Sequence, residues 1–348
     1  MKTLHLTVDP SQLETPGAEA ALGCAAAILR TGGLVALPTE TVYGLGANAL
    51  DRAAVARIFK AKQRPAWDPI IVHVASEAML EGLVAGVSNA ARKLIKAFWP
   101  GPLTLLLPRT LAVPDAVTAG RPLVGVRMPS HPVALALIRR AGVPVAAPSA
   151  NRFGHISPTT AAHVLDDLEG RIDAVLDAGP TPRGVESTVL DPSRSPMTIY
   201  RPGAVTAEQI REIVGPVEVH NDSEAFEETP AEALPSPGAG LRHYAPRARL
   251  AEAASGASIE RLGVMLPAGV AAPPGIAAGR VYAWGSWSAP EELAQRLYAG
   301  LRALDAAGCT VILCPLPNAE GLGAAIRDRL KRAGNNGTRE RENDGTSE

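Results

Sequence analysis

The sequence lacks most of the features that mark metal-binding, secreted or membrane proteins. Its three cysteines, Cys24, Cys309 and Cys314, are an odd number with no CxxC spacing, so we expect reduced, buried thiols and no structural zinc site. No run of 18 apolar residues occurs, which excludes a membrane-spanning helix. The first residues, MKTLHLTVDP, contain no hydrophobic block typical of a secretory signal. We therefore expect a cytoplasmic protein without membrane contact.

Net charge, aromatic residues and the familiar nucleotide-binding loops are also scarce. The 348 residues carry a formal charge of -1 and only 4% aromatic side chains, which excludes a general positive field for nucleic acid and disfavours rows of base-stacking rings. GxxxxGK[ST] and GxSxG are absent, and Gly44-Leu45-Gly46 is too short for a dinucleotide fingerprint. Side chains and strand-end loops would have to hold any nucleotide.

The pattern of apolar segments predicts an α/β protein. Predicted strands alternate with predicted helices over the first 215 residues, and short connections between the later strands indicate that part of the sheet is antiparallel. The predicted strands are 34–37, 69–74, 102–107, 122–128 and 143–147, followed by AVLDA, STVLD and MTIYR. The predicted helices are 18–30, 51–61, 88–98, 132–140 and 159–168.

The length and a change in composition predict two domains. Residues 1–215 form the first, and the acidic, proline-rich stretch 216–247 reads as a linker. Residues 248–334 form a smaller α/β domain with helices at 290–306 and 321–333, and the polar residues 335–348 form a frayed tail.

Short polar segments follow several of the predicted strands. PTET follows the predicted strand LVAL, and APSAN follows the predicted strand VPVAA. Arg127 lies near the end of VGVRM, and Arg201 is the last residue of TIYR. Ligands of open α/β sheets bind beyond the carboxyl ends of strands, although serine, asparagine and proline are also ordinary turn formers. We expect these polar loops to meet at one edge of the sheet.

FKAKQRP supplies a basic element beside these loops. Lys62 and Arg64 lie near the end of the predicted helix 51–61, where cations also complement the helix dipole. In extended backbone the two side chains would project to one side and form a phosphate clamp. His73, within an apolar strand, reads by itself as a buried core histidine.

These segments together resemble a known family. PTETVYGLG, KQRP with PIIVHV, WPGPLTLLL, VGVRMP, APSAN, SPTT, ESTVLD and RPGAV follow each other from about residue 15 to 215. They resemble the threonylcarbamoyl-AMP synthases, and SPGAGLRHYAP with GLGAAIRDRL resembles the two-domain form. The resemblance implies a YrdC-like twisted mixed sheet flanked by helices, plus a smaller Rossmann-like C-terminal domain.

The resemblance also implies an activity and its site. The enzyme would make threonylcarbamoyl-AMP and pyrophosphate from L-threonine, bicarbonate and ATP with Mg²⁺, and a downstream enzyme would transfer the threonylcarbamoyl group to tRNA. Lys62 and Arg64 would be catalytic. The threonine-binding residues would be Thr41, His73, Arg127, Ala147 and Ser187. The ATP-binding residues would be Arg64, Asp68, Leu123, Ser149, Asn151, Ser157, Arg201 and Tyr244, the last from a linker that acts as a lid.

Two differences from the family's usual residues and two alternative functions stay open at this point. Asp68 stands where the family usually has asparagine, and a side-chain contact there would place a negative charge near the phosphates. Ala239-Gly240-Leu241 replaces larger, basic residues of the lid. A double-stranded RNA-binding module without synthesis would show steep salt dependence; direct tRNA binding is left open. Carbamoyl transfer in hydrogenase maturation would require zinc-type cysteine pairs, which are absent.

Overall fold

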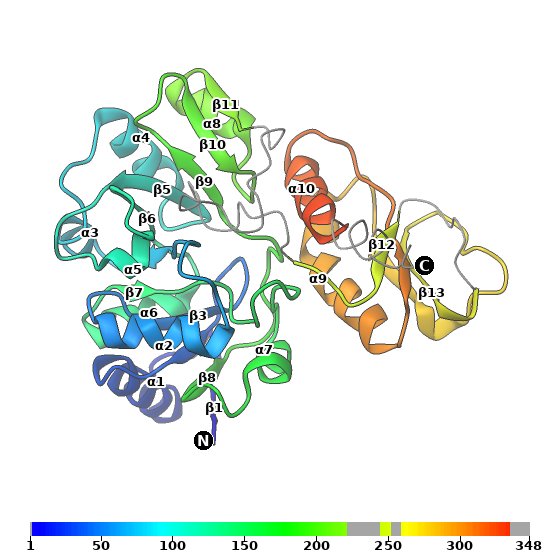
Figure 1. Ribbon diagram of the computed structural model, residues 1–348, viewed down its shortest axis with the longest axis horizontal. Helices are drawn as coiled ribbons and strands as arrows, with labels where there is room; N and C mark the ends of the chain where they lie inside the picture. The colour runs from blue at the N-terminus through cyan, green and yellow to red at the C-terminus, as the bar shows by residue number, and fades with distance from the viewer. Residues whose placement is uncertain (1, 221–243, 252–258, 335–348) are drawn as a thin grey trace, which may run out of the picture.

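The described residues form two separate sheets, which belong to two α/β domains lying side by side (Figure 1). The computed structural model describes residues 2–220, 244–251 and 259–334. Most of the predicted linker, including Ala239-Gly240-Leu241, and the predicted tail 335–348 lie outside the described residues. The fold class is confirmed: a large mixed sheet with helices accompanies a small parallel sheet.

Within the part of the chain that the structure describes, the large sheet has eleven strands in the order β1-β8-β2-β3-β7-β4-β6-β5-β9-β10-β11. Both parallel and antiparallel pairs occur, as the short connections predicted. The strands are β1 (Leu4–Thr7), β2 (Val35–Leu37), β3 (Gly44–Asn48), β4 (Val72–His73), β5 (Leu103–Pro108), β6 (Leu123–Arg127), β7 (Val145–Ala146), β8 (Ala174–Asp177), β9 (Thr188–Asp191), β10 (Met197–Arg201) and β11 (Val217–Val219).

Several helices of the large domain begin at side-chain caps. Thr15 and Asp51 accept hydrogen bonds from the first turns of the helices that follow them, which satisfies backbone donors that have no partner within a helix. The helices are α1 (Pro16–Arg30), α2 (Arg52–Lys62), α3 (Glu77–Glu81), α4 (Asn89–Phe98), α5 (Asp115–Thr118), α6 (Pro132–Ala141), α7 (Ala161–Leu168) and α8 (Ala207–Val214).

The two faces of the large sheet are covered differently. One face, which includes Ala36 and Val72, packs beneath α2, α4, α7 and α8. The other face, which includes Val35 and Val145, packs beneath α1 and α6. Farther along this second face lies a small apolar cluster, Ile71, Leu106, Val189 and Tyr200 with Leu123. None of these five residues is helical.

The small domain is a parallel sheet in the order β12-β15-β13-β14. Its strands are β12 (Arg249–Ala251), β13 (Leu262–Pro267), β14 (Val281–Gly285) and β15 (Val311–Leu313), its long helices are α9 (Pro290–Ala306) and α10 (Leu322–Gly334), and its short 3₁₀ segments are Ile259–Arg261 and Ala278–Arg280. Helices α9 and α10 lie on the side that faces the large domain (Figure 1).

Candidate functional site

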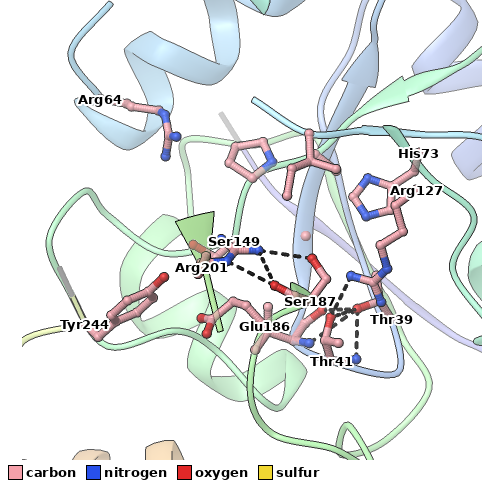
Figure 2. Close-up of a pocket in the computed structure, with 15 residues that line it drawn as sticks. Thr39, Thr41, Arg64, His73, Arg127, Ser149, Glu186, Ser187, Arg201 and Tyr244 are labelled. Carbon is pink, nitrogen blue, oxygen red and sulfur yellow. Dashed lines mark hydrogen bonds between the residues drawn. The ribbon is translucent and has the colours of Figure 1, made fainter. Parts of the chain in front are cut away.

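A pocket lies next to the small apolar cluster of the large sheet, which contributes Ile71 to its lining (Figure 2). Ile71 and His73 both line it, and residues two apart on a strand share a face. The lining residues are Thr39, Thr41, Val42, Gly44, Arg64, Ile71, His73, Arg127, Ala147, Pro148, Ser149, Glu186, Ser187, Arg201 and Tyr244. The pocket therefore combines polar segments from distant parts of the sequence.

These segments do not meet at one edge of the sheet, so that prediction is wrong. Strand β4 is antiparallel to β7 and parallel to β6. The carboxyl ends of β4 and β6 therefore point away from the edge where β7 ends. His73 and Arg127 reach the pocket from one direction and Ala147 and Ser149 from the other. The sequence could not show this, because strand direction depends on pairing between distant segments.

Arg127 is held rigidly by the loop between β2 and β3. Its guanidinium forms a 2.6 Å ion pair with Glu40, donates to the Thr41 hydroxyl at 3.0 Å and donates to the Gly101 carbonyl at 3.1 Å. Burial alone would raise the pKa of Glu40, but the charge and hydrogen bond of Arg127 hold that pKa below its usual value. Of the five N–H donors of an arginine, the described residues engage three here.

His73 lies beside Arg127 because the two residues are paired in the register of β4 and β6. Burial and the positive charge of Arg127 lower the pKa of His73 to about 3. The imidazole is therefore neutral near pH 7. No described residue forms a hydrogen bond with its Nδ1, so this polar atom is available to a ligand.

Ser187 and Arg201 form a second fixed group in the pocket. The Ser187 hydroxyl is 2.8 Å from the Thr104 hydroxyl and accepts from Arg201 at 3.0 Å. Arg201 also donates to the Ser187 carbonyl through Nε at 3.1 Å and Nη2 at 3.0 Å. This bracing orients the Arg201 guanidinium before any ligand is bound.

Arg64 lies toward the other end of the pocket from His73 and Arg127 (Figure 2). It pairs with Asp68 at 2.9 Å and donates to the carbonyls of Asp68 at 3.2 Å and Pro69 at 2.7 Å. The two side chains are only 3% and 1% exposed. The Asp68 side chain, and not only its backbone, therefore contacts Arg64, the arginine that was expected to bind phosphate.

The predicted geometry of the Lys62–Arg64 clamp is wrong. Lys62 is the last residue of α2, and Gln63 has a left-handed backbone (φ 55°), so the segment is not extended. The Lys62 ammonium instead donates to the carbonyls of Ser149 at 2.6 Å and Asn151 at 2.5 Å. Burial and the nearby Arg64 charge lower the pKa of Lys62 well below its usual value. Lys62 thus binds the loop after β7, and it does not line the pocket.

Glu186 is a pocket residue that the sequence analysis did not assign. It directly precedes Ser187, and the signal was an acid at the start of a buried strand. Its carboxylate accepts from Ser157 at 2.6 Å, from Tyr298 at 2.8 Å and from Arg329 at 2.7 Å. Burial alone would raise the pKa of Glu186, but Arg329 and Arg201 hold it below its usual value.

The structure brings most of the predicted site residues together. Those that line the pocket are Thr41, Arg64, His73, Arg127, Ala147, Ser149, Ser187, Arg201 and Tyr244. Those that do not line it are Lys62, Asp68, Leu123, Asn151 and Ser157. Of the latter, Lys62, Asp68 and Ser157 contact lining residues directly, and Leu123 packs against Ile71 and its neighbours. Asn151 joins Lys62 to the loop after β7 and donates to the His155 carbonyl at 2.6 Å.

The described residues contain no group of three or more histidine, cysteine or acidic side chains that could hold a metal ion. None of the described helices is long and apolar enough to cross a membrane. The lining of the pocket combines arginines and hydroxyls with His73 and Glu186, and arginines suit an anionic or zwitterionic ligand.

Two family models match consecutive parts of the chain. The model described as "Telomere recombination", which covers Sua5-, YciO- and YrdC-type domains, matches residues 27–203. The model described as "Threonylcarbamoyl-AMP synthase, C-terminal domain" matches residues 205–335.

Similar proteins cover nearly the whole chain. The threonylcarbamoyl-AMP synthase of Pyrococcus abyssi is 43% identical over 89% of this chain and 92% of its own length. That of Bacillus subtilis is 42% identical over 96% and 98%. The solved structure of P. abyssi Sua5 complexed with L-threonine superposes with a TM-score of 0.84 at 39% identity, and covers 96% of this chain and 98% of its own.

Proposed function

The chain belongs to the threonylcarbamoyl-AMP synthase family, and we propose that the pocket described above is where its substrates react. Members of this family are nucleotidyltransferases that make threonylcarbamoyl-AMP for the threonylcarbamoyl-adenosine modification of tRNA. A module that binds RNA without synthesis does not match this family. The observation that carries the proposal is that the predicted threonine residues and Arg64, which was predicted to contact phosphate, line one cavity.

Threonine binds at the end of the pocket formed by Arg127, His73 and Thr41. The described residues engage three of the five N–H donors of Arg127. The other two suit the carboxylate of the amino acid. The Ser187 hydroxyl and the backbone near Ala147 complete this end. The relative from P. abyssi, whose structure is described as complexed with L-threonine, supports a threonine site in this fold.

ATP binds toward Arg64 and Arg201, with Ser149 and Tyr244 beside them. Asp68, Leu123, Asn151 and Ser157 support this end from behind the pocket wall. Magnesium would enter with ATP as the substrate complex and would offset negative charge on the phosphates. Lys62 acts as a positioning residue by fixing the carbonyls of Ser149 and Asn151.

The reaction has two steps. The threonine amine attacks bicarbonate to give a carbamate and water, and a carbamate oxygen then attacks the α-phosphorus of ATP while pyrophosphate leaves. The carbamate loses carbon dioxide readily, so the reactants must be held close together and away from water. Arg64 and Arg201 stabilise the charge that builds on the departing pyrophosphate. The chemistry requires no covalent bond to the protein. The product then passes to a separate cytoplasmic enzyme that transfers the threonylcarbamoyl group to tRNA.

The test is product analysis after incubation with ATP, L-threonine and bicarbonate. The wild-type chain should release pyrophosphate and form threonylcarbamoyl-AMP, and Arg64→Ala should reduce both by a large factor, at least about tenfold, since one charge-assisted contact to the leaving group is lost. Arg64→Ala also leaves Asp68 without its ion-pair partner, so the double variant Arg64→Ala/Asp68→Ala is the matched control. Pyrophosphate release that is unchanged in both variants would refute the role of Arg64.

A further inference from the structure

Arg302 of the small domain binds the loop that follows β7 in the large domain. Its Nη2 atom donates to the Ile156 carbonyl at 2.5 Å and to the Asp167 carboxylate at 2.7 Å. Arg302 lies on α9 and Asp167 on α7, and their side chains are 14% and 8% exposed. The Ile156 side chain belongs to the same buried apolar cluster as Leu297 and Leu301 of α9. One guanidinium therefore joins α9 to both a helix and a loop of the large domain.

The Asp167 carboxylate attaches the same loop a second time. Its other oxygen, Oδ1, lies 2.8 Å from Nδ1 of His155, the residue before Ile156. Burial alone would raise the pKa of Asp167, but hydrogen bonds from His155 and Arg302 hold that pKa below its usual value. The carboxylate is therefore ionised near pH 7, and hydrogen bonds to an ionised group are the stronger kind. These contacts fix the middle of residues 154–157, the anchored segment.

The two ends of the anchored segment are linked to the lining of the pocket. The Gly154 carbonyl accepts from the amide of Ala245 at 2.8 Å, which fixes the backbone next to Tyr244. The Ser157 hydroxyl donates to Glu186 at 2.6 Å. Tyr244 and Glu186 both line the pocket (Figure 2). A displacement of the anchored segment would therefore be transmitted to the pocket at two places.

The anchored segment also supports the part of the loop that carries Ser149, a predicted ATP-binding residue that lines the pocket. The Asn151 side chain donates to the His155 carbonyl at 2.6 Å. The Lys62 ammonium in turn donates to the carbonyls of Ser149 and Asn151. The large domain thus holds this loop through Lys62, and the small domain holds it through Arg302.

We propose that Arg302 is a positioning residue for the ATP end of the pocket, which fixes the anchored segment and through it Ser149 and Tyr244. This inference rests on the proposed function, since it assumes that ATP binds beside these two residues. Arg302 acts through a backbone carbonyl and a carboxylate that do not line the pocket, so it needs no contact with a substrate. It gives the small domain a direct part in ATP binding.

The first measurement is steady-state pyrophosphate release by the full-length chain. Arg302→Met should raise the KM for ATP about tenfold, which corresponds to about 1.4 kcal/mol, and should change the KM for threonine much less. Arg302→Lys keeps a charged donor and should retain most of the ATP affinity. Asp167→Asn should shift the KM for ATP in the same direction by a smaller factor. Arg296→Met is the matched control, because it removes an arginine of the same helix that pairs with Glu292 within the small domain, and it should resemble the wild type.

The second measurement is amide hydrogen exchange of the folded protein without substrates. The amides of Phe153, His155 and Ala245 donate to carbonyls in and beside the loop. In Arg302→Met they should exchange about tenfold faster, because the loop opens locally more often, while the amides of α1 should keep the wild-type rates. This local pattern distinguishes positioning of the loop from a general loss of stability.

The inference is overturned if Arg302→Met leaves the KM for ATP unchanged, raises both KM values by the same factor, or speeds exchange throughout the chain. Should Arg302→Met not fold, Asp167→Asn decides in its place, and an unchanged KM for ATP in that variant overturns the inference. If the wild-type chain makes no threonylcarbamoyl-AMP, the proposed function fails, and hydrogen exchange still tests the anchoring of the loop. If the wild type is active and neither measurement responds to Arg302→Met, only this inference fails.

Discussion

Asp68→Asn changes the charge of the group that holds Arg64 while it preserves that group's shape. In the free protein the Asp68 carboxylate forms an ion pair with the Arg64 guanidinium at 2.9 Å, and the same guanidinium donates to the carbonyls of Asp68 and Pro69. ATP must therefore compete with Asp68 for Arg64. Asparagine would keep a neutral acceptor oxygen and remove the competing negative charge.

The size of the effect follows from the burial of the pair. Two unit charges 4 Å apart interact by about 4 kcal/mol at the effective dielectric constant of about 20 that suits most protein sites. If about a third of that energy is transferred to the phosphates, the Kd for ATP falls about tenfold. The free protein loses the ion pair but keeps a hydrogen bond, so we expect it to lose about 1–2 kcal/mol of stability. Its Tm should then fall by a few degrees, roughly 2–4 °C per kcal/mol.

Calorimetric titration with Mg–ATP and thermal unfolding with and without ATP together measure both effects. Asp68→Asn should lower the Tm of the free protein and increase the stabilisation by saturating ATP. The matched control is Asp173→Asn, which removes the charge of an acid paired with Arg57 at 2.7 Å outside the residues that line the pocket, and should leave the ATP affinity unchanged. A lower Tm with an unchanged or weaker affinity for ATP would refute the competition between Asp68 and the phosphates.

Two further predictions concern the small domain and the pH dependence of stability. A fragment of residues 1–220 should keep the folded content of the large domain by circular dichroism yet lose most pyrophosphate release, because Glu186 loses Arg329 and Tyr298; a fully active fragment would contradict this. The pKa of His73 is lowered to about 3 from the usual 6.5, so the folded protein binds this proton less readily than the unfolded chain. The stabilising contribution of neutral His73 is therefore fully present above about pH 6.5 and declines as the pH falls toward 3. The free energy of unfolding from denaturant titrations at pH 7 and 5 should fall less in His73→Gln than in the wild type, and an equal or larger fall would contradict the assignment.

Local sequence determined much of the secondary structure. The predicted helix 18–30 corresponds to Pro16–Arg30, and the predicted helix 290–306 has the same bounds in the structure. These segments combine apolar periodicity with proline at the first turn, and both signals act within the segment itself. The predicted strand 69–74 was longer than the two residues of β4 that pair, because pairing depends on neighbouring strands that the local pattern does not show.

Nine of the site residues that the family resemblance implied line one pocket. Hydroxyls, arginines and prolines after apolar strands are a local signal of strand-end loops. The sequence did not determine what each charge contacts. The helical end of α2 turned Lys62 away from the pocket and toward the loop after β7.

Only the tertiary structure decided the electrostatic arrangement of the site. Glu186 and Arg329 are separated by 143 residues along the chain, and nothing local in either segment indicates their pairing. The antiparallel direction of β4 and β7 likewise arises from long-range strand pairing, and it places the pocket on a face of the sheet. Buried charges are stable only with a partner at short distance. In this chain the packing of the two domains therefore sets the partners of the pocket carboxylate Glu186.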